Sequence, residues 1–463
     1  MSSRAQKILV ATIVLIGVAG LIVVVRWRAS GRTQRPNIVL IVIDTLRADH
    51  VGCYGYGRNT TPHIDRLARD AWVFKNAVSS APWTTPSVAS LLTSQYPSEL
   101  GVREELARIN PSFPLLSQIL RRNGYTTCGI VTSPTLAASL GFDRGFDEYE
   151  EAYDHASTTH DDICSPAVTS KAIEFLRRKH IKPFFLFVHN FDPHYNYILH
   201  PEYDFYPAYT GSLTSGERIR ELWKRLDTLS DDDVRYLTSL HDSEIAFTDE
   251  HIGKLLDELV RLGLYENTMV IVTADHGEEF MERGWLGHTV TLYQELIHVP
   301  LVVRVPGATA QQIDTSVGLV DVLPTVLAHA NIEAPQGIEG QALSPEGLRA
   351  ADHHPRFSET FNNQPRAERH REPIALRCVV HRGRKVIFDA MNDRTQCYDL
   401  SRDPLEGTDI SGAGEPEMTA LREKLMQWID QMDRQYPAPS TTQDAHELFT
   451  PDQIKTLKSL GYL

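Results

Sequence analysis

The stretch Asn37-Ile-Val-Leu-Ile-Val-Ile-Asp44 is a continuous apolar run that ends in an acid. Such a run is typical of a strand buried on both faces, as in a parallel sheet covered by helices. Ligands of open α/β sheets bind at the carboxyl ends of the strands, where Asp44 would lie. A structural alternative is that Asp44 caps a turn. In either case the stretch predicts an α/β fold.

A second stretch repeats this design far along the chain. Thr268-Met-Val-Ile-Val-Thr-Ala-Asp275 is again a buried run ending in an acid, and His276 and Gly277 follow it. Two such strand ends can meet at one edge of a sheet and offer two carboxylates and an imidazole to one cation. Donors of this kind suit Mn²⁺, Mg²⁺, Ca²⁺ or Zn²⁺. We therefore expect a metal site at this edge.

A third stretch, Ala81-Pro-Trp-Thr-Thr-Pro-Ser-Val-Ala-Ser-Leu-Leu-Thr-Ser94, carries the signals of a helix start. Thr85 is a good N-cap, and Pro86 fits the first helical position. Thr84 is then expected just outside the helix, where free N–H groups and the helix dipole favour an anionic oxygen. The stretch is either a structural helix start or the place of a nucleophile.

Polar and aromatic residues follow a further predicted strand, 183–189. His189, Asp192 and His194 lie within six residues of one another, and they are either structural or functional. The segment 195–209 holds six aromatic residues, which either pack over the sheet or form a flap that faces the substrate.

Periodicity and turn signals predict the rest of the chain. Helices are expected at 115–123, 168–179, 240–262, 315–330 and 416–432, and strands at 125–131 and 299–305. Residues 373–400 predict a small antiparallel sheet, and Thr450-Pro-Asp-Gln453 has capping-box spacing for a last helix closed at Gly461. A polar connection at 350–372 divides the chain into an N-terminal segment 1–36, a catalytic domain 37–349 and a C-terminal subdomain 350–463.

Composition excludes several classes of protein. The chain has 463 residues, of which 42% are hydrophobic and 23% charged, so it can bury a large core. A net charge of -14 argues against a nucleic-acid partner, which requires a basic footprint. Five cysteines without a CxxC pair indicate neither a zinc cluster nor a dense disulfide scaffold.

The N-terminus contains an uncharged run of 18 residues, Ile8 to Val25. Its length predicts an uncleaved membrane anchor, with a cleaved signal peptide as the alternative. Arg4 and Lys7 precede the run and four arginines follow it, so the positive-inside rule leaves the orientation open.

Six segments together resemble the sulfatase family of the alkaline phosphatase superfamily. These segments are Asn37–Asp44, Thr84–Thr93, Asp192–His194, Asp249–Gly253, Ala274–Gly277 and Leu292–Leu301. The resemblance implies an α/β sandwich around a large mixed sheet, with a smaller C-terminal antiparallel sheet and helix. It also implies an ester-cleaving site at the strand ends and a catalytic domain that works outside the cytoplasm.

The resemblance assigns roles residue by residue. Asp44, Asp275 and His276 look like metal ligands, and Thr84 falls on the nucleophile position, which also faces the metal. His194 matches a position that contacts the substrate and protonates the leaving oxygen. His288 completes the predicted catalytic residues, and it precedes the position of the family's anion-contacting lysine.

The chain departs from the family pattern at five places. Thr84 cannot be converted to formylglycine, since the product would not be an aldehyde. Val88 replaces the arginine of that motif, Thr45 a second metal-binding aspartate, and Thr289 the anion-contacting lysine. The family's Lys-x-His has no match near 129–132. A Thr nucleophile without these cations looks like the phosphodiesterases and the membrane-anchored phosphoethanolamine and phosphoglycerol transferases of the superfamily.

We therefore expect a metal-dependent hydrolase or transferase of phosphoric or sulfuric esters with Thr84 as nucleophile. It would use one divalent metal, and His189, Asp192 and His288 could help to hold a second. The substrate would be an anionic ester on a lipid or a glycan. Two alternatives are a sulfatase that uses no formylglycine and a membrane-anchored binding protein without catalysis.

Overall fold

The computed structural model describes residues 35–103, 107–152, 164–344, 354–362, 373–437 and 448–459. The predicted anchor at 8–25 and the helix end at Gly461 lie outside these ranges. Within them, no helix combines the length and apolarity that a membrane span requires.

A mixed eight-stranded sheet forms the centre of the molecule, in the order β10-β2-β9-β6-β1-β5-β3-β4. Strand β1 runs parallel to both β5 and β6, whereas β9 runs antiparallel to β6 and β2. The strands are β1 Asn37–Ile43, β2 Trp72–Val78, β3 Thr126–Val131, β4 Glu148–Glu151, β5 Phe184–Asn190, β6 Thr268–Ala274, β9 His298–Arg304 and β10 Gln311–Gly318. The first quoted stretch thus supplies a central strand.

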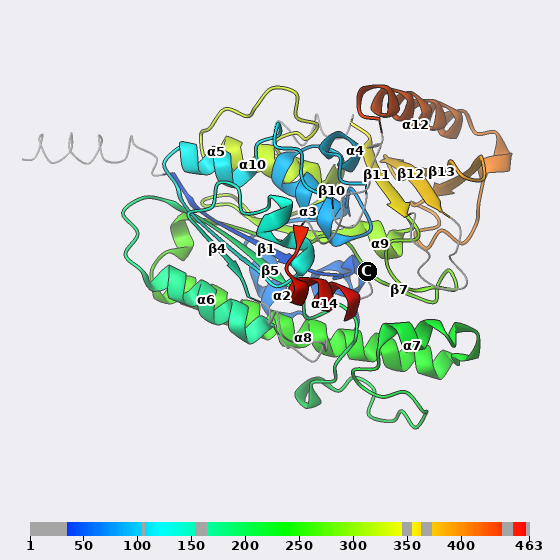
Figure 1. Ribbon diagram of the computed structural model, residues 1–463, viewed down its shortest axis with the longest axis horizontal. Coiled ribbons are helices and arrows are strands. Elements are labelled where there is room, and N and C mark those ends of the chain that lie inside the picture. The colour runs from blue at the N-terminus through cyan, green and yellow to red at the C-terminus, as the bar shows by residue number, and fades with distance from the viewer. Residues whose placement is uncertain are drawn as a thin grey trace, which may run out of the picture.

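Helices cover both faces of this sheet (Figure 1). Helices α6 and α8 lie on one face and α3, α5 and α10 on the other. The helices are α2 Pro62–Ala68, α3 Thr84–Thr93, α4 Pro97–Leu100, α5 Leu116–Arg122, α6 Ser165–Arg177, α7 Ile219–Trp223, α8 Asp231–Arg261, α9 Gln294–Ile297, α10 Val322–His329, α12 Pro416–Gln435 and α14 Pro451–Ser459. Because both faces are covered, all seven residues of β1 are buried, as the apolar run predicts.

A four-stranded antiparallel sheet with one covering helix follows, as expected. Its order is β11-β12-β13-β14. The strands are β11 Arg356–Asn362, β12 Ile374–His381, β13 Arg384–Asp389 and β14 Arg394–Asp399. Helix α12 packs on this sheet, where Trp428 stacks on Phe357 with ring centroids 4.4 Å apart. A two-stranded ribbon, β7 Glu279–Phe280 and β8 Leu286–Gly287, extends from the end of β6.

Two predicted helices have different bounds in the structure. Residues 315–318 belong to strand β10, which pairs with β2, and the helix there begins only at Val322. Pairing with the sheet edge satisfies the backbone of this segment and buries Val317, which outweighs its helical periodicity. Helix α8 begins at Asp231 instead of 240, because Ser230 accepts a hydrogen bond from the Asp233 amide as an N-cap.

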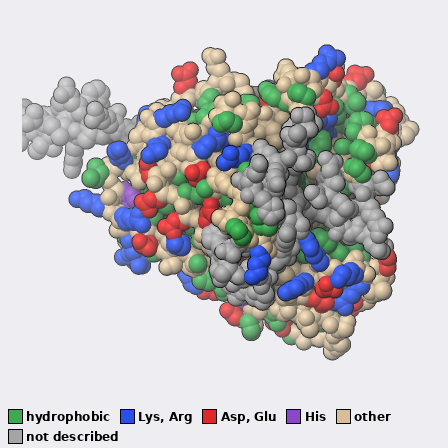
Figure 2. All heavy atoms as spheres, in the orientation of Figure 1, with side chains coloured by type: hydrophobic (Ala, Val, Ile, Leu, Met, Phe, Trp, Pro, Cys, Tyr) green, Lys and Arg blue, Asp and Glu red, His purple; other side chains and the backbone are tan. Residues whose placement is uncertain are grey.

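Basic and acidic side chains are interspersed over the face of the molecule seen in Figure 2. On that face, the charge of the described residues is mixed in sign rather than gathered in one region.

Candidate functional site

Three adjacent strands place acids and imidazoles side by side at their carboxyl ends. The register pairs Ile43 of β1 with Ala274 of β6, so Asp44 and Asp275 leave the sheet as neighbours. On the other side of β1, Val42 pairs with His189 of β5. The predicted meeting of the two acid-ended strands is therefore what the fold produces.

Four of these side chains bring their polar atoms close together. The Nε2 atom of His276 lies 3.4 Å from Asp44 Oδ1 and 3.6 Å from Asp275 Oδ2. The Nε2 atom of His189 lies 3.6 Å from Asp44 Oδ2 and 3.9 Å from Asp275 Oδ2. All four side chains are buried. We call Asp44, His189, Asp275 and His276 the strand-end centre.

The tautomer of His276 is set by its own neighbour. Its Nδ1 lies 2.8 Å from the carbonyl oxygen of Gly277. A carbonyl only accepts hydrogen bonds, so Nδ1 carries a proton, and Nε2 is the nitrogen that faces the two carboxylates. This is the arrangement in which a protein holds an imidazole as a metal ligand.

The strand-end centre fits a divalent cation. Within the described chain, Asp44 Oδ1, Asp275 Oδ2 and both ring nitrogens of His189 are buried without a hydrogen-bond partner. Buried polar atoms are normally paired, and a cation would satisfy an oxygen of each acid and a nitrogen of His189. Donors of mixed oxygen and nitrogen type are suitable for Zn²⁺ or Mn²⁺.

The two acids respond differently to their surroundings. Burial, together with the charge of Asp275, raises the pKa of Asp44 well above its usual range. For Asp275, burial also acts to raise the pKa, but the imidazoles of His276 and His189 outweigh it and lower the pKa to about 2. Two adjacent buried carboxylates repel each other, and a cation between them would remove that repulsion.

Thr84 directs its hydroxyl at this centre. Its Oγ1 donates to Asp44 Oδ2 over 3.3 Å and lies 3.4 Å from His276 Nε2. The prediction that Thr84 lies outside the helix is wrong: α3 begins at Thr84, and Trp83, with an extended backbone, is the N-cap. Pro86 is tolerated at the third helical position, because the first four amides of a helix have no intrahelical acceptor.

His288 and His194 lie beside the strand-end centre. The ring of His288 is 4.5 Å from that of His276 and 4.9 Å from that of His194, measured between centroids. The Nδ1 atom of His194 lies 2.8 Å from the Tyr195 carbonyl oxygen, so it carries a proton. The structure thus brings together Thr84, His194 and His288 with the predicted ligands Asp44, Asp275 and His276.

Glu278 is a neighbour of His288 that the sequence reasoning missed. Its Oε1 lies 2.9 Å from Nδ1 of His288, and both side chains are buried. Burial raises the pKa of Glu278 to about 8 and, with the charge of His276, lowers the pKa of His288 well below its usual range. Glu278 directly follows Asp275-His276-Gly277, and this position in the sequence could have indicated that it lies at the site.

Asp192 and the aromatic segment do not contribute to the strand-end centre. The Asp192 carboxylate accepts the amides of Cys164 and Ser165, over 2.5 and 2.7 Å, at the start of α6. The prediction that Asp192 could hold a second metal is therefore wrong. Tyr195 and Tyr197 are buried in a small core beside the sheet, as the packing interpretation predicts, although Tyr195 also stacks on His288 at 5.1 Å.

Two threonines beside the site adopt left-handed backbone conformations. Thr45 follows Asp44 with a φ of 55°, and Thr289 follows His288 with a φ of 83°. A β-branched residue is strained in this region, and such strain is concentrated at functional sites. The two strained turns aim Asp44 and His288 into the site.

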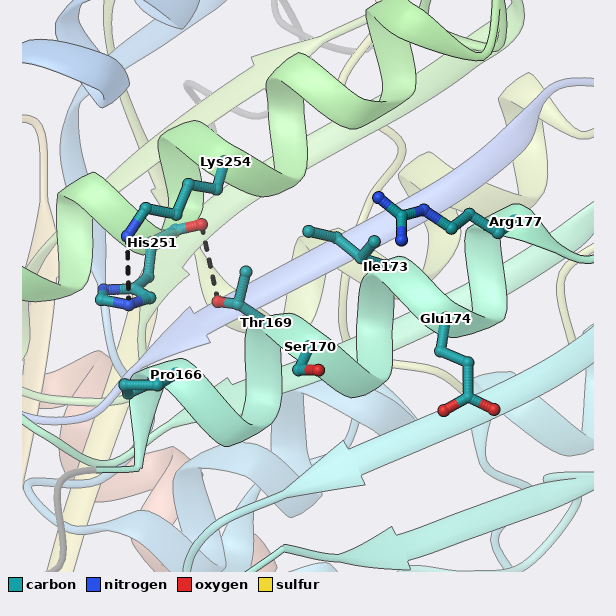
Figure 3. A pocket seen from close by; sticks show the side chains of 8 residues that line it. All are labelled: Pro166, Thr169, Ser170, Ile173, Glu174, Arg177, His251 and Lys254. Atoms are coloured by element: carbon teal, nitrogen blue, oxygen red, sulfur yellow. Dashed lines mark hydrogen bonds between the residues drawn. The ribbon is translucent and has the colours of Figure 1, made fainter.

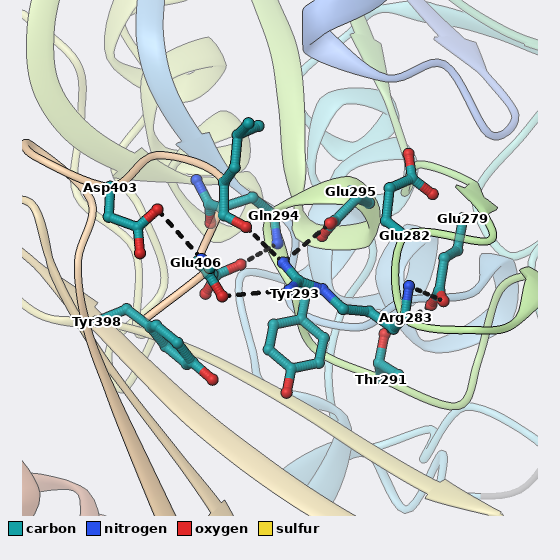
Figure 4. A network of polar contacts seen from close by, with 12 residues as sticks. Glu279, Glu282, Arg283, Thr291, Tyr293, Gln294, Glu295, Tyr398, Asp403 and Glu406 are labelled. Carbon is teal, nitrogen blue, oxygen red and sulfur yellow. Dashed lines mark hydrogen bonds and ion pairs between the residues drawn. The ribbon is translucent and has the colours of Figure 1, made fainter. Parts of the chain in front are cut away.

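The segments on both sides of His288 are anchored on the part of the chain that follows β14 (Figure 4). Arg283 forms an ion pair with Glu295 over 3.0 Å and donates to the carbonyl of Leu405 over 2.6 Å. The Gln294 amide donates to Glu406 over 2.6 Å. Contacts with the segment after β14 therefore hold the loop of His288 in place.

A groove of about 500 Å³ lies between α6 and α8, away from the strand ends (Figure 3). Its basic side chains are already engaged: Arg177 pairs with Glu258 over 2.7 Å, and Lys254 with Glu250 over 2.8 Å. The strand-end centre is consequently the better candidate for chemistry.

Comparison with known proteins assigns the family. The sulfatase family pattern matches residues 36–332, and the pattern of the N-sulphoglucosamine sulphohydrolase C-terminal region matches residues 281–435. N-acetylglucosamine-6-O-sulfatase of Bacteroides thetaiotaomicron is 24% identical, with 91% of this chain and 90% of that protein covered.

Solved structures share the fold. A protein in complex with its substrate D-glucosamine-2-N,6-O-disulfate superposes with a TM-score of 0.68 at 21% identity, over 88% of this chain and 99% of that one. The phosphonate monoester hydrolase of Agrobacterium radiobacter superposes with a TM-score of 0.69 at 20% identity, over 87% and 96%. With a family match over more than half of its length, the chain belongs to the sulfatase family and is an ester hydrolase of the alkaline phosphatase superfamily.

Proposed function

We propose that the protein is a metal-dependent hydrolase or transferase of phosphoric esters, with Thr84 as its nucleophile. One observation carries the proposal: Thr84 Oγ1 lies within 3.4 Å of both Asp44 and His276, two of the residues that would hold the metal. Oxidation of the threonine secondary alcohol would give a ketone and not the aldehyde of formylglycine, so Thr84 would act through its hydroxyl and form a covalent ester.

The residues divide the chemistry among them. Asp44, Asp275 and His276 would hold the divalent metal, which when bound would supply Lewis acidity beside the Thr84 hydroxyl. Thr84 Oγ1 bonds to phosphorus as the bond to the leaving oxygen breaks, and its proton has an acceptor in Asp44 Oδ2. His194, with Nδ1 held by a carbonyl, delivers a proton from Nε2 to the leaving oxygen.

The second step releases the covalent ester. Water, or the hydroxyl of an acceptor in a transferase, attacks phosphorus and gives its proton to His194 Nε2, which lost one in the first step. The bond to Thr84 Oγ1 breaks, and the proton accepted by Asp44 returns to Thr84. His288 stays neutral, since burial lowers its pKa, and can hydrogen-bond to an oxygen of the transferred group through Nε2. Its Nδ1 is held by Glu278.

Charge favours a phosphodiester over more highly charged esters. Within the described chain, the ion pairs of Asp44 and Asp275 are all with the imidazoles of His189 and His276. The arginine and lysine of the sulfatase pattern are here Val88 and Thr289. A site with few cations binds a singly charged diester at a lower electrostatic cost than a dianion.

Turnover of three substrates tests the proposal: bis(4-nitrophenyl) phosphate, 4-nitrophenyl phosphate and 4-nitrophenyl sulfate, with Mn²⁺, Zn²⁺ or Ca²⁺. We expect the diester to react fastest, and Thr84→Val to lower that rate by about a thousandfold or more. Thr85→Val is the matched control and should retain activity, because the Thr85 hydroxyl donates to the Thr135 carbonyl outside the strand-end centre. Turnover of sulfate alone would overturn the preference for phosphorus.

Sulfate-ester hydrolysis without formylglycine is the second candidate. The N-acetylglucosamine-6-O-sulfatase that matches 91% of this chain favours it, and so does the bound disulfated glucosamine of the structural relative. On this proposal the substrate is a sulfated sugar, and the same three-substrate measurement separates the two candidates. A third candidate is a binding protein without catalysis. It would be supported if neither Thr84→Val nor Asp275→Ala altered the turnover of any ester or the metal content.

The location of the protein is also a proposal. The uncharged run at 8–25 supports an N-terminal anchor, and the resemblance supports a catalytic domain outside the cytoplasm that acts on lipid-linked or glycan-linked esters. The division at 350–372 into catalytic domain and C-terminal subdomain stays a prediction.

A further inference from the structure

We infer that His189 is a fourth metal ligand, and that the strand-end centre is a site with two nitrogen and two oxygen donors which selects Zn²⁺-like ions over Ca²⁺ and Mg²⁺. This inference rests on the proposed function, because it concerns the metal of the same site. It adds a ligand from strand β5 to the three residues that the sequence predicts.

The distances place both imidazoles beside the same two carboxylates. The Nε2 atom of His276 is 3.4 Å from Asp44 Oδ1 and 3.6 Å from Asp275 Oδ2. The Nε2 atom of His189 is 3.6 Å from Asp44 Oδ2 and 3.9 Å from Asp275 Oδ2. In a tetrahedral zinc site with bonds of about 2.0–2.1 Å, neighbouring ligand atoms are about 3.3–3.4 Å apart. The four distances between imidazole nitrogens and carboxylate oxygens, 3.4–3.9 Å, are near this spacing.

A purely structural role for His189 does not account for its surroundings. The side chain is fully buried, yet neither ring nitrogen has a hydrogen-bond partner in the described chain. Its carbonyl accepts the Thr132 hydroxyl over 2.8 Å, a contact that does not involve the ring. A buried imidazole left in this way is costly, and coordination through Nε2 offsets the cost.

The donor set determines which ion fits. Ca²⁺ requires about six to eight oxygen ligands, and Mg²⁺ prefers oxygen in octahedral geometry. Asp44, His189 and Asp275 each have a ligand atom within 4.8 Å of the others, and His276 Nε2 lies near oxygens of the same two acids. Two imidazoles and two carboxylates suit Zn²⁺, with Thr84 or the substrate as a further ligand.

A second group of possible ligands, His50, His241 and Asp242, serves as the comparison. Its acid is already saturated: Asp242 accepts from Tyr56 over 2.6 Å and Arg58 over 2.5 Å, and pairs with His50 over 2.7 Å. A cation there would meet the positive charge of Arg58. We therefore expect metal in the strand-end centre and not in this group.

The test measures metal binding and not activity. The full chain and the variants His189→Ala, His189→Asp and Asp275→Ala are stripped with a chelator, and Zn²⁺ and Mg²⁺ affinities are measured by competition titration. His241→Gln is the control for the second group. We expect His189→Ala to weaken Zn²⁺ binding by about a hundredfold or more, since even changes beyond the ligands cost about 10–100-fold. His189→Asp should shift the preference from Zn²⁺ toward Mg²⁺, and His241→Gln should bind Zn²⁺ as the wild type does.

A measurement on the wild type covers the case in which the variants fail to fold. X-ray absorption at the zinc edge counts coordinated imidazoles, and we expect two. A count of one imidazole would overturn the inference. So would a Zn²⁺ affinity that is unchanged in folded His189→Ala but lost in Asp275→Ala. Either result would leave the proposed function standing. No metal bound to the wild type overturns both.

Discussion

At the scale of single residues, the site depends on backbone atoms as much as on its side chains. Carbonyl groups set the tautomers of His276 and His194, and the left-handed turns at Thr45 and Thr289 aim their neighbours. None of these features is visible in the residue types. The sequence could therefore predict which side chains meet but not why their lone pairs point where they do.

Gly277 allows the closest backbone approach at the site. A Cβ atom there would lie 2.0 Å from the Glu295 carbonyl oxygen, and the Gly277 amide donates to the Leu296 carbonyl over 2.8 Å. We expect Gly277→Ala to lower the free energy of unfolding by about 1–3 kcal/mol, because backbone must move to make room. Urea denaturation measures the change.

The control is Gly57→Ala, since a Cβ atom at Gly57 meets nothing within 4 Å. It should change the stability by less than about 1 kcal/mol. Equal losses for the two variants would contradict the steric argument.

Residue identity alone misassigned Asp192. An acid between two histidines after a strand indicates a metal site, but the Asp192 carboxylate accepts two amides at the start of α6. His189, which lies one residue before the end of the same strand, takes the place beside the acids. Packing determines on which face of the sheet a side chain at a strand end lies. A single sequence does not contain that information.

At the scale of elements, the apolar runs predicted the central strands well because burial on both faces requires them. Strands β1 and β6 each have seven buried residues. Residues 315–318 of strand β10 were predicted as the start of a helix, since this strand lies at the sheet edge and carries polar side chains. Boundaries set by tertiary pairing are thus the part of the fold that local periodicity does not determine.

Asp192 gives a prediction for helix α6. Replacing it with alanine leaves the amides of Cys164 and Ser165 without their carboxylate acceptor, so we expect a loss of about 1–3 kcal/mol in the free energy of unfolding. Zn²⁺ content should not change, because the side chain does not reach the strand-end centre. Asp257→Ala, which breaks an exposed ion pair with Arg66, is the control and should cost less than about 1 kcal/mol. Loss of metal from the Asp192 variant would restore the interpretation as a ligand.

Glu99 at the start of helix α4 gives a prediction for pH. Burial, with the charge of Glu339 added, raises the pKa of Glu99 to about 8, from a usual value near 4.5. The folded state therefore binds this proton more tightly than the unfolded state. The stabilisation is complete below about pH 4.5 and is lost as the pH rises through about 8.

We expect the free energy of unfolding to fall by a few kcal/mol between pH 6 and pH 9, since one pKa unit corresponds to about 1.4 kcal/mol. Glu99→Gln keeps the acceptor for the Tyr96 amide and should reduce this fall. The pH dependence is measured by urea denaturation of both proteins, and an undiminished fall in the variant would exclude Glu99 as its source.

At the scale of the whole molecule, the small sheet is coupled to the site through a buried ion pair. Lys385 and Glu406 are 2.7 Å apart with both side chains fully buried, and Glu406 also accepts the Gln294 amide. We expect Lys385→Met to lower the free energy of unfolding by about 3–5 kcal/mol, because it leaves Glu406 buried without its cation. Adding Glu406→Gln should recover part of the loss, and a double variant less stable than the single one would contradict this reasoning.

The central claim is that Thr84 is the nucleophile, and mass spectrometry tests it most directly. The metal-loaded protein is mixed with bis(4-nitrophenyl) phosphate, quenched in acid during turnover, and digested for peptide mapping. We expect a 4-nitrophenyl phosphoryl adduct on Thr84 in the peptide that contains helix α3. Thr84→Val should show neither adduct nor turnover. Full turnover by Thr84→Val, with no adduct on the wild-type residue, would contradict it.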